Sequence, residues 1–179
     1  MKNVIIVSTS IRNGSNSEIL AHEFEKGAIE AGNTVDFLTL KGKRLEFCRG
    51  CLACQKTGRC VIRDDMDDMI ERFRKADVIC FATPVYYYEM SGQLKTLLDR
   101  LNPLFGTDHR FKEIYLIATC YDENRAALDR AINGLGGWIE CFDGVSLKGV
   151  IYGNGLNNPN QANASESILK ETYIIGKNI

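Results

Sequence analysis

Short apolar runs alternate with stretches of helical periodicity along this chain of 179 residues, and that alternation limits the possible folds most strongly. Runs at 3–7, 78–83, 114–119 and 145–152 are typical of buried strands. At 34–40 apolar and polar residues alternate, which predicts a strand nearer the sheet edge. Strands that alternate with helices form a parallel sheet covered on both faces. We therefore expect an α/β doubly wound sheet of five parallel strands in the order 2-1-3-4-5.

A helix is predicted between or after these strands in five places. The second of them has apolar residues at i, i+3, i+4 and i+7, which marks a face that packs on the sheet. Because no repeat or linker interrupts the pattern, one domain over residues 1–179 is expected, with a loop without periodicity at 41–64. The predicted helices are 15–31, one that begins at Asp64 or Asp65, one from Ser91, 123–133 and one from Ser165.

The first strand ends in a polar loop, residues 8–17, that leads into the first helix. At a helix N-terminus, free backbone N–H groups and the positive end of the helix dipole favour an anion. The loop therefore predicts a site for the phosphate of a mononucleotide. It contains no carboxylate and offers five hydroxyls, an amide, a cation and a glycine: Ser8, Thr9, Ser10, Ser15, Ser17, Asn16, Arg12 and Gly14.

Other interpretations of this loop remain open at this point. A P-loop needs Gly-Lys-Ser/Thr at the helix start, whereas residues 14–17 read Gly-Ser-Asn-Ser. A dinucleotide fingerprint needs three glycines, and only Gly14 is present. The simplest alternative is a capping loop without a ligand, in which Ser15 or Asn16 is the N-cap.

Composition bounds the kind of protein. Hydrophobic residues make up 45%, enough for a core, and the net charge of −1 argues against a general nucleic-acid binder. No apolar run approaches the length that spans a membrane. The strand pattern begins by Val4, which leaves no room for a signal peptide, so the cytoplasm is the expected location. In that reducing compartment, the seven cysteines are not expected to form a disulfide framework.

In the expected topology, the loops after strands 1, 3 and 4 lie side by side at the carboxyl edge of the sheet. The loop after strand 3, 84–92, contains three consecutive tyrosines, and the loop after strand 4 is 119–124. The tyrosines cannot all face the core, so a planar ligand could lie against one of the rings. A tyrosine-rich loop is equally typical of a protein interface, and both uses are compatible.

These motifs resemble the flavodoxin-like NAD(P)H-dependent FMN reductases. Residues 10–17, Ser-Ile-Arg-Asn-Gly-Ser-Asn-Ser, are similar to that family's phosphate loop. Residues 83–87, Thr-Pro-Val-Tyr-Tyr, with Met-Ser-Gly-Gln-Leu-Lys at 90–95 and Asp99-Arg100, resemble its second flavin loop and the following helix. Thr9 and Ile11 stand where the family often has Gly and Pro. The similarity covers about residues 1–125, and the rest matches only in element order.

The resemblance implies FMN as cofactor and NAD(P)H as co-substrate. The chemistry then belongs to the flavin, so no catalytic side chain is expected. A small-molecule acceptor and assembly as a homodimer or homotetramer are also implied. The phosphate would lie on Ser10, Arg12, Ser15, Asn16 and Ser17, and the isoalloxazine ring along Pro84, Val85, Tyr86 and Tyr87, with Thr119, Cys120 and Tyr121 at its far edge.

Four cysteines lie within 13 residues, with two-residue gaps repeated twice: Cys48, Cys51, Cys54 and Cys60. Such spacing is similar to the run that wraps an iron–sulfur cluster, and to the compact motif of the iron–sulfur flavoproteins, a branch of the same family. A [4Fe–4S] cluster on these four thiolates is therefore expected. Bound zinc and free or oxidised thiols are the alternatives. Cys80 is expected in the core, and Cys141 is unassigned.

Seven basic and two acidic side chains surround these cysteines at 41–64. They could offset the negative charge of a cluster, dock an acidic ferredoxin-like protein, or bind the phosphate of NADPH. The sequence thus predicts an FMN-dependent oxidoreductase that passes electrons between NAD(P)H or a ferredoxin-like donor and a small acceptor, with a cluster as relay. The alternatives are a cluster-free NAD(P)H:quinone or FMN reductase and, from another class, a receiver-type signalling domain. The last would need carboxylates at the ends of strands 1 and 3.

Overall fold

Five parallel strands form the centre of the computed structural model, which describes all residues 1–179. Their spatial order is β2-β1-β3-β5-β6, which is the order 2-1-3-4-5 of the five parallel strands and confirms the predicted fold. β1 lies between β2 and β3, and it pairs with β2 from Asn3 to Ser8 and with β3 from Val4 to Ser8. The strands are β1 (Asn3–Ser8), β2 (Thr34–Thr39), β3 (Val78–Tyr86), β5 (Glu113–Thr119) and β6 (Ser146–Gly153).

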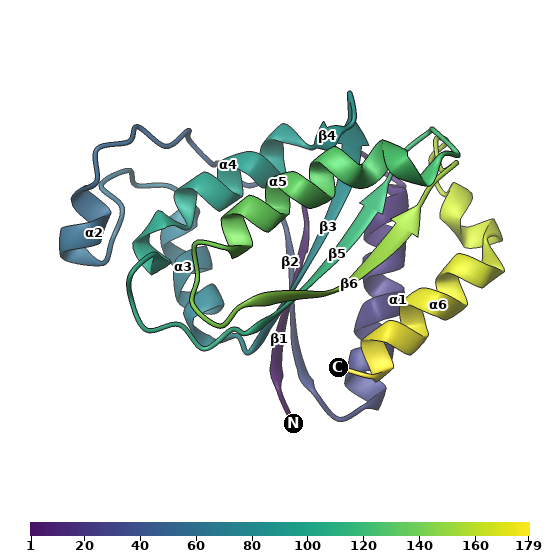
Figure 1. Cartoon of the computed structure of the whole chain (residues 1–179), viewed down its shortest axis with the longest axis horizontal. Helices are drawn as coiled ribbons and strands as arrows, with labels where there is room; N and C mark the ends of the chain where they lie inside the picture. The colour runs from purple at the N-terminus through teal and green to yellow at the C-terminus, as the bar shows by residue number, and fades with distance from the viewer.

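Helices cover both faces of this sheet (Figure 1). One face carries α1 (Asn16–Glu30) and α6 (Glu166–Lys177), and the other carries α3 (Met66–Lys75), α4 (Gly92–Arg100) and α5 (Asp129–Ile139). No helix combines the length and the apolar character needed to cross a membrane. Four short helical segments complete the fold: α2 (Ala53–Thr57), η1 (Asn102–Leu104), η2 (Arg125–Leu128) and η3 (Gln161–Ala164).

The predicted starts of α1, α3 and α4 are confirmed by the positions of their N-caps. The Ser15 hydroxyl accepts a hydrogen bond from the backbone N–H of Glu18, and the Ser91 hydroxyl accepts one from the backbone N–H of Leu94. Asp65 is the N-cap position of α3. The two serine hydroxyls satisfy donors that an α-helix leaves without an internal partner, whereas the Asp65 side chain makes no capping bond. A serine before an apolar stripe therefore predicts these two helix starts well.

The expected loop at 84–90 is instead a hairpin, and the sheet has a sixth strand. β3 continues to Tyr86, and β4 (Glu89–Met90) pairs antiparallel with its end. The turn is closed by Tyr87 and Tyr88, whose φ angles are 51° and 67°. Such a turn normally contains Asn or Gly, so a Tyr-Tyr pair gave no local turn signal.

The prediction for α5 was wrong at both ends, since the helix begins at Asp129 and continues through three glycines to Ile139. Gly134 lies against the hairpin: a Cβ built there would be 3.1 Å from the Met90 side-chain methyl. Packing of this kind outweighs the weak helix propensity of glycine. The predicted irregular segment 41–64 is confirmed apart from the short α2, and it extends away from the sheet on the left of Figure 1.

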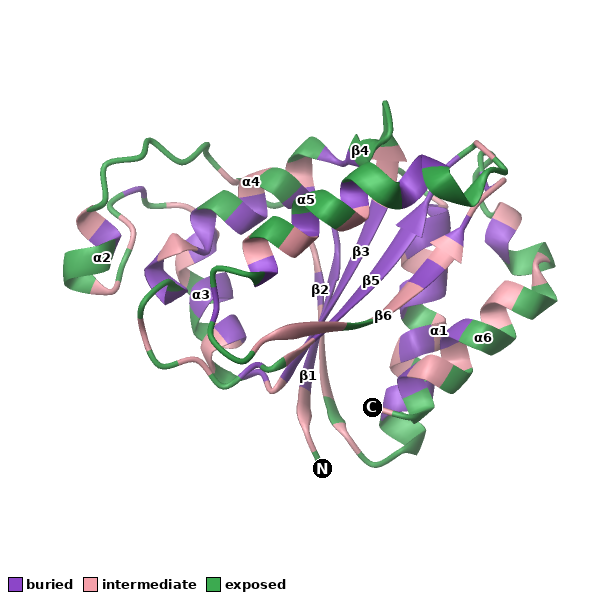
Figure 2. Cartoon of the chain, viewed as in Figure 1, coloured by how far each residue is buried: buried purple, intermediate pink, exposed green.

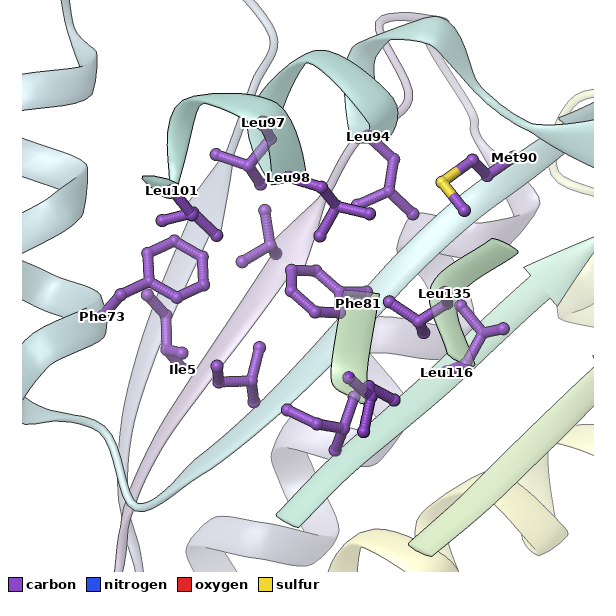
Figure 3. Packing of buried hydrophobic residues seen from close by; sticks show 14 of the residues in the cluster. Ile5, Phe73, Phe81, Met90, Leu94, Leu97, Leu98, Leu101, Leu116 and Leu135 are labelled. Atoms are coloured by element: carbon purple, nitrogen blue, oxygen red, sulfur yellow. The ribbon is translucent and has the colours of Figure 1, made fainter. Parts of the chain in front are cut away.

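Two apolar clusters hold the helices to the sheet. The larger lies under α3, α4 and α5, where Phe73 and Phe81 stack with ring centroids 6.2 Å apart and leucines of α4 pack above them (Figure 3). The smaller lies under α1 and α6 around Phe24, and Cys80 is buried in it, as expected. Figure 2 shows the central strands buried and the outer faces of α2 and α6 largely exposed. The core thus fixes the sheet edge on which the functional loops lie.

Replacing Gly27 with alanine is expected to destabilise the fold by roughly 1–3 kcal/mol, because α1 and α6 touch through glycines. A Cβ at Gly27 would lie 2.2 Å from the Tyr173 carbonyl oxygen, which belongs to the helix backbone and cannot rotate away. Urea unfolding measures the loss. Gly137→Ala is the control, since a Cβ there meets open space in a helix and should raise stability by about 0.4–1 kcal/mol. Equal effects in both variants would contradict the close-packing argument.

Candidate functional site

The loop between β1 and α1 presents a row of unpaired backbone donors. The N–H groups of Ser10, Ile11 and residues 13–17 donate no hydrogen bond within the chain. Ser10 and residues 15–17 are nevertheless buried, and buried N–H groups need a partner. Free N–H groups at a helix N-terminus are the groups that bind anions in proteins, so these seven donors have the chemistry that a flavin phosphate needs.

Gly14 and Thr9 give this loop its shape. Gly14 has φ of +65°, a conformation that glycine adopts without strain. Thr9 stands where the resembling family often has glycine. Its hydroxyl is buried, donates to the Ala82 carbonyl oxygen at 3.0 Å and lies 3.1 Å from the Ser91 hydroxyl. The threonine is therefore fully satisfied and ties the loop to β3 and to the start of α4.

The side chains of the predicted phosphate residues are arranged less simply than expected. Asn16 directs its amide to the loop after β6, with Nδ2 donating to the Asn158 carbonyl oxygen at 2.9 Å. Arg12 is exposed and donates from Nη1 to the Asn157 carbonyl oxygen at 3.0 Å. The hydroxyls of Ser15 and Ser17 lie 3.1 Å apart. The residues predicted from the sequence are brought together, but the free groups are mainly backbone N–H groups.

A cavity of 670 Å³ opens at the same carboxyl edge of the sheet, lined by residues at or after the ends of β3, β5 and β6 and by no residue of this loop. Of the predicted flavin residues, Val85, Tyr87, Cys120 and Tyr121 line it. Pro84 and Thr119 are paired across β3 and β5 just below, and Tyr86 lies in the hairpin ladder. The sequence missed the other lining residues, which come from the hairpin turn, from the segment after β5 and from the loop after β6: Tyr88, Asp122, Glu123, Ala127 and Gly155.

Cys120 forms part of the cavity wall as a neutral thiol. Its Sγ donates to the Asp122 carbonyl oxygen at 3.2 Å, and burial raises the pKa of the thiol above its usual value. Asn154 Nδ2 holds the same segment, because it donates to the Asp122 and Asn124 carbonyl oxygens at 3.0 and 2.8 Å. The neutral thiol and the backbone of residues 120–124 are therefore held in place at the far edge of the cavity, where Asp122 and Glu123 also line the wall.

The four clustered cysteines line a second cavity, of 400 Å³. Asn102 Nδ2 donates to Cys54 Sγ at 3.0 Å, and the Gly50 N–H donates to Cys48 Sγ at 3.4 Å. All seven cysteines are free thiols, and Cys141 at the end of α5 is a fifth thiol in the wall of this cavity. No three His, Cys, Asp or Glu side chains are placed to hold a single metal ion. A shared cavity with donors to sulfur fits a cluster, which is larger than one ion.

A buried ion pair closes the base of the cysteine loop. Arg100 donates from Nη1 to Asp64 Oδ2 at 2.7 Å and from Nη2 to Asp64 Oδ1 at 2.8 Å, and both side chains are fully buried. Arg100 also donates to the Glu46 carbonyl oxygen at 2.6 Å. Burial alone would raise the pKa of Asp64, but the bonds from Arg100 and from the backbone hold it below its usual value. Residues 46 and 64, which lie on either side of the four clustered cysteines, are thus tied to α4.

The fold and this edge of loops define a nucleotide-binding protein of the doubly wound, flavodoxin-like class. Residues 1–143 match the NADPH-dependent FMN reductase family, and the chain belongs to this family of flavin-dependent oxidoreductases. The resemblance noted in the sequence is thereby confirmed. The match ends before β6, so the C-terminal loop and α6 lie outside it.

Relatives and solved structures agree with this assignment. An iron–sulfur flavoprotein of Methanocaldococcus jannaschii is 39% identical over 101 residues, which are 56% of this chain and 52% of that protein. The chain spans about half the length of the curated relatives it matches. An NAD(P)H:quinone oxidoreductase from Methanothermobacter marburgensis has the same fold, with a TM-score of 0.76 at 20% identity over 99% of this chain and 95% of that one. An azoreductase from Bacillus anthracis, 20% identical, also has this fold, with a TM-score of 0.75 over 100% of both chains.

Proposed function

We propose that this protein binds FMN and acts as an NAD(P)H-dependent oxidoreductase that passes electrons to a small-molecule acceptor. One observation carries the proposal: seven unpartnered backbone N–H groups lie at the sheet edge that also holds the tyrosine-lined cavity. A phosphate and a planar ring system need these two environments side by side. Bound FMN supplies hydride and electron transfer.

The residues of the chain would bind and orient this cofactor. The backbone from Ser10 to Ser17 would hold the phosphate, while Val85, Tyr87 and Tyr121 would lie along the ring. Cys120 remains a neutral wall, so it offers no thiolate to the flavin. Pro84 and Thr119 do not line the cavity, but they pair across β3 and β5 and so would fix the strand ends that carry Val85 and Cys120. This arrangement needs no acidic or basic side chain for a proton step.

We further propose that Cys48, Cys51, Cys54 and Cys60 hold a [4Fe–4S] cluster, which supplies one-electron transfer when bound. Three observations support this: the four cysteines share a cavity, N–H groups donate to Cys48 and Cys54, and the sequence is similar to proteins described as iron–sulfur flavoproteins. The basic side chains of 41–64 would dock an acidic ferredoxin-like protein. Added salt should then lower the rate of electron transfer between the two proteins, because salt screens the attraction between opposite charges.

The visible spectrum of anaerobically purified protein, with iron and sulfide assays, tests both proposals. Stoichiometric FMN with about four irons and four sulfides supports the relay. FMN without iron or sulfide, even after reconstitution, would leave a cluster-free NAD(P)H:quinone or FMN reductase, our second candidate. That candidate is favoured by the separation of the flavin cavity from the cysteine cavity, which share no lining residue. Failure to bind FMN would overturn both candidate functions, with and without the cluster.

A receiver-type signalling domain does not fit the site. Its metal-binding carboxylates would stand where residues 8–10 and 83–85 read Ser-Thr-Ser and Thr-Pro-Val, and the family match lies with oxidoreductases. We also propose that the protein assembles as a homodimer or homotetramer in which the hairpin 86–90 lies at a subunit boundary. Tyr87, at the tip of this hairpin, is 97% exposed. Light scattering that shows a monomer at micromolar concentration with FMN bound would contradict this.

Replacing Arg12 with alanine is expected to weaken FMN binding by about 1.5–3 kcal/mol, because a charge-assisted contact to the phosphate is lost. Fluorescence titration of the apoprotein measures the dissociation constant. Arg110→Ala is the control, since Arg110 pairs with Asp77 at the other edge of the sheet. If the two variants bind FMN like the unaltered protein, Arg12 lies outside the site.

A further inference from the structure

The loop after β6 is bound directly onto the phosphate loop, although the two are more than 140 residues apart in sequence. Residues 157–162, which we name the C-terminal clasp, receive or donate four hydrogen bonds there. Arg12 Nη1 and Asn16 Nδ2 donate to the carbonyl oxygens of Asn157 and Asn158. In Figure 1 this loop lies beside the start of α1. The clasp falls outside the family match, which ends at residue 143.

Asn16 is the centre of these contacts. Its side chain is 1% exposed, and its two polar ends both face the clasp: Nδ2 donates to the Asn158 carbonyl oxygen at 2.9 Å, and Oδ1 accepts from the Ala162 N–H at 3.0 Å. The Asn160 N–H donates to the Gly14 carbonyl oxygen at 2.8 Å. The side chain of Asn16 therefore fixes the loop, while its backbone N–H remains among the free donors.

Gln161 builds the clasp itself without touching the phosphate loop. Its Oε1 accepts from the N–H groups of Asn157 and Asn158 at 2.8 and 3.0 Å, and its Nε2 donates to the Gly155 carbonyl oxygen at 2.9 Å. These bonds aim the carbonyl groups of Asn157 and Asn158 at Arg12 and Asn16. Substitution of Gln161 would release the clasp while every residue of the phosphate loop keeps its identity.

We infer that Asn16 and Gln161 are positioning residues that hold the seven N–H donors in their anion-binding arrangement, and that the clasp thereby selects phosphate-bearing flavin over riboflavin. This inference rests on the proposed FMN site. A polar loop of several residues costs conformational entropy to order, and a clasp that orders it in advance leaves less to be lost on binding. Riboflavin lacks the phosphate, so it gains nothing from the ordered donors.

The test measures the dissociation constants of FMN and riboflavin with apoprotein of full length, and thermal unfolding verifies each variant. Gln161→Leu and Asn16→Ala are each expected to weaken FMN binding about tenfold or more, and riboflavin binding by less than about twofold. The double variant should bind FMN no more weakly than Asn16→Ala alone, because both changes open the same clasp. Asn33→Ala is the control: it removes a hydrogen bond from the Lys2 N–H at the opposite sheet edge and should change neither constant.

Equal loss of FMN and riboflavin binding would overturn the inference, because the clasp would then support the fold without reading the phosphate. Unchanged FMN binding in the two variants, or additive effects in the double variant, would also overturn it. If Asn16→Ala does not fold, Gln161→Leu alone decides by the same ratio. If the unaltered protein binds no FMN, the proposed function is refuted. If the unaltered protein binds FMN but the variants give one of the contrary results above, only the inference is refuted.

Discussion

Replacing Cys51 with alanine is expected to abolish iron binding and leave FMN in place. Cys51 lines the same cavity as the three other clustered cysteines, and a [4Fe–4S] cluster needs a ligand on each iron. The flavin cavity shares no residue with this one, so its occupancy should not change. Iron, sulfide and flavin assays on anaerobically reconstituted protein measure the three quantities together.

Cys141→Ala is the matched control for this experiment. Cys141 is a free, exposed thiol in the wall of the same cavity but belongs to the end of α5 rather than to the cysteine loop. This variant should keep a full complement of iron and sulfide. Iron retained in Cys51→Ala but lost in Cys141→Ala would show that the ligand set has been assigned to the wrong thiols.

The largest expected effect on stability comes from Arg100→Met, with a loss of about 3–5 kcal/mol in the free energy of unfolding. Removal of the guanidinium leaves the fully buried Asp64 carboxylate without its partner and frees the Glu46 carbonyl oxygen. Urea unfolding at neutral pH measures the loss. Lys95→Met on the same helix is the control, because the exposed pair of Lys95 and Asp99 should contribute well under about 1 kcal/mol.

The pH dependence gives this prediction a second readout. The pKa of Asp64 is lowered in the folded protein, so its contribution is present above the unfolded value and is lost as pH falls through the folded pKa. Without Arg100, only the backbone N–H groups of Glu46 and Met66 would oppose the effect of burial, so the pKa of Asp64 should be higher than in the unaltered protein and protonation in acid would relieve the buried charge. The difference in stability between the unaltered protein and Arg100→Met should therefore shrink in acid. A difference that is constant with pH would mean that the pair contributes by packing alone.

Helix α4 connects the two halves of the candidate site. Its N-cap is Ser91, whose hydroxyl lies 3.1 Å from the hydroxyls of both Thr9 in the polar loop and Thr83 at the end of β3. It ends at Arg100, which holds the base of the cysteine loop. A helix of 9 residues thus connects the polar loop after β1 with the base of the cysteine loop and fixes their separation.

The sequence by itself determined the parallel sheet and the place of each candidate group. Apolar runs of Val, Ile and Phe predicted the strands, and serines before apolar stripes predicted the starts of α1 and α4. The polar loop 8–17 and the four clustered cysteines were found without a fold, because their chemistry lies in contiguous residues. Such signals are local: they depend on side-chain periodicity and on hydrogen bonds within one helical turn.

Only the tertiary structure decided how those groups are held. Asn16 reads as a phosphate ligand in the sequence, yet its amide is used by residues 142 and 146 positions away. Arg100 reads as part of a helix, yet it closes a loop that ends 36 residues earlier. The hairpin and the extended α5 likewise meet only in the folded chain, where Met90 lies against Gly134. Buried polar groups must find partners wherever the folded chain brings them, and distance along the sequence carries no signal of that partner.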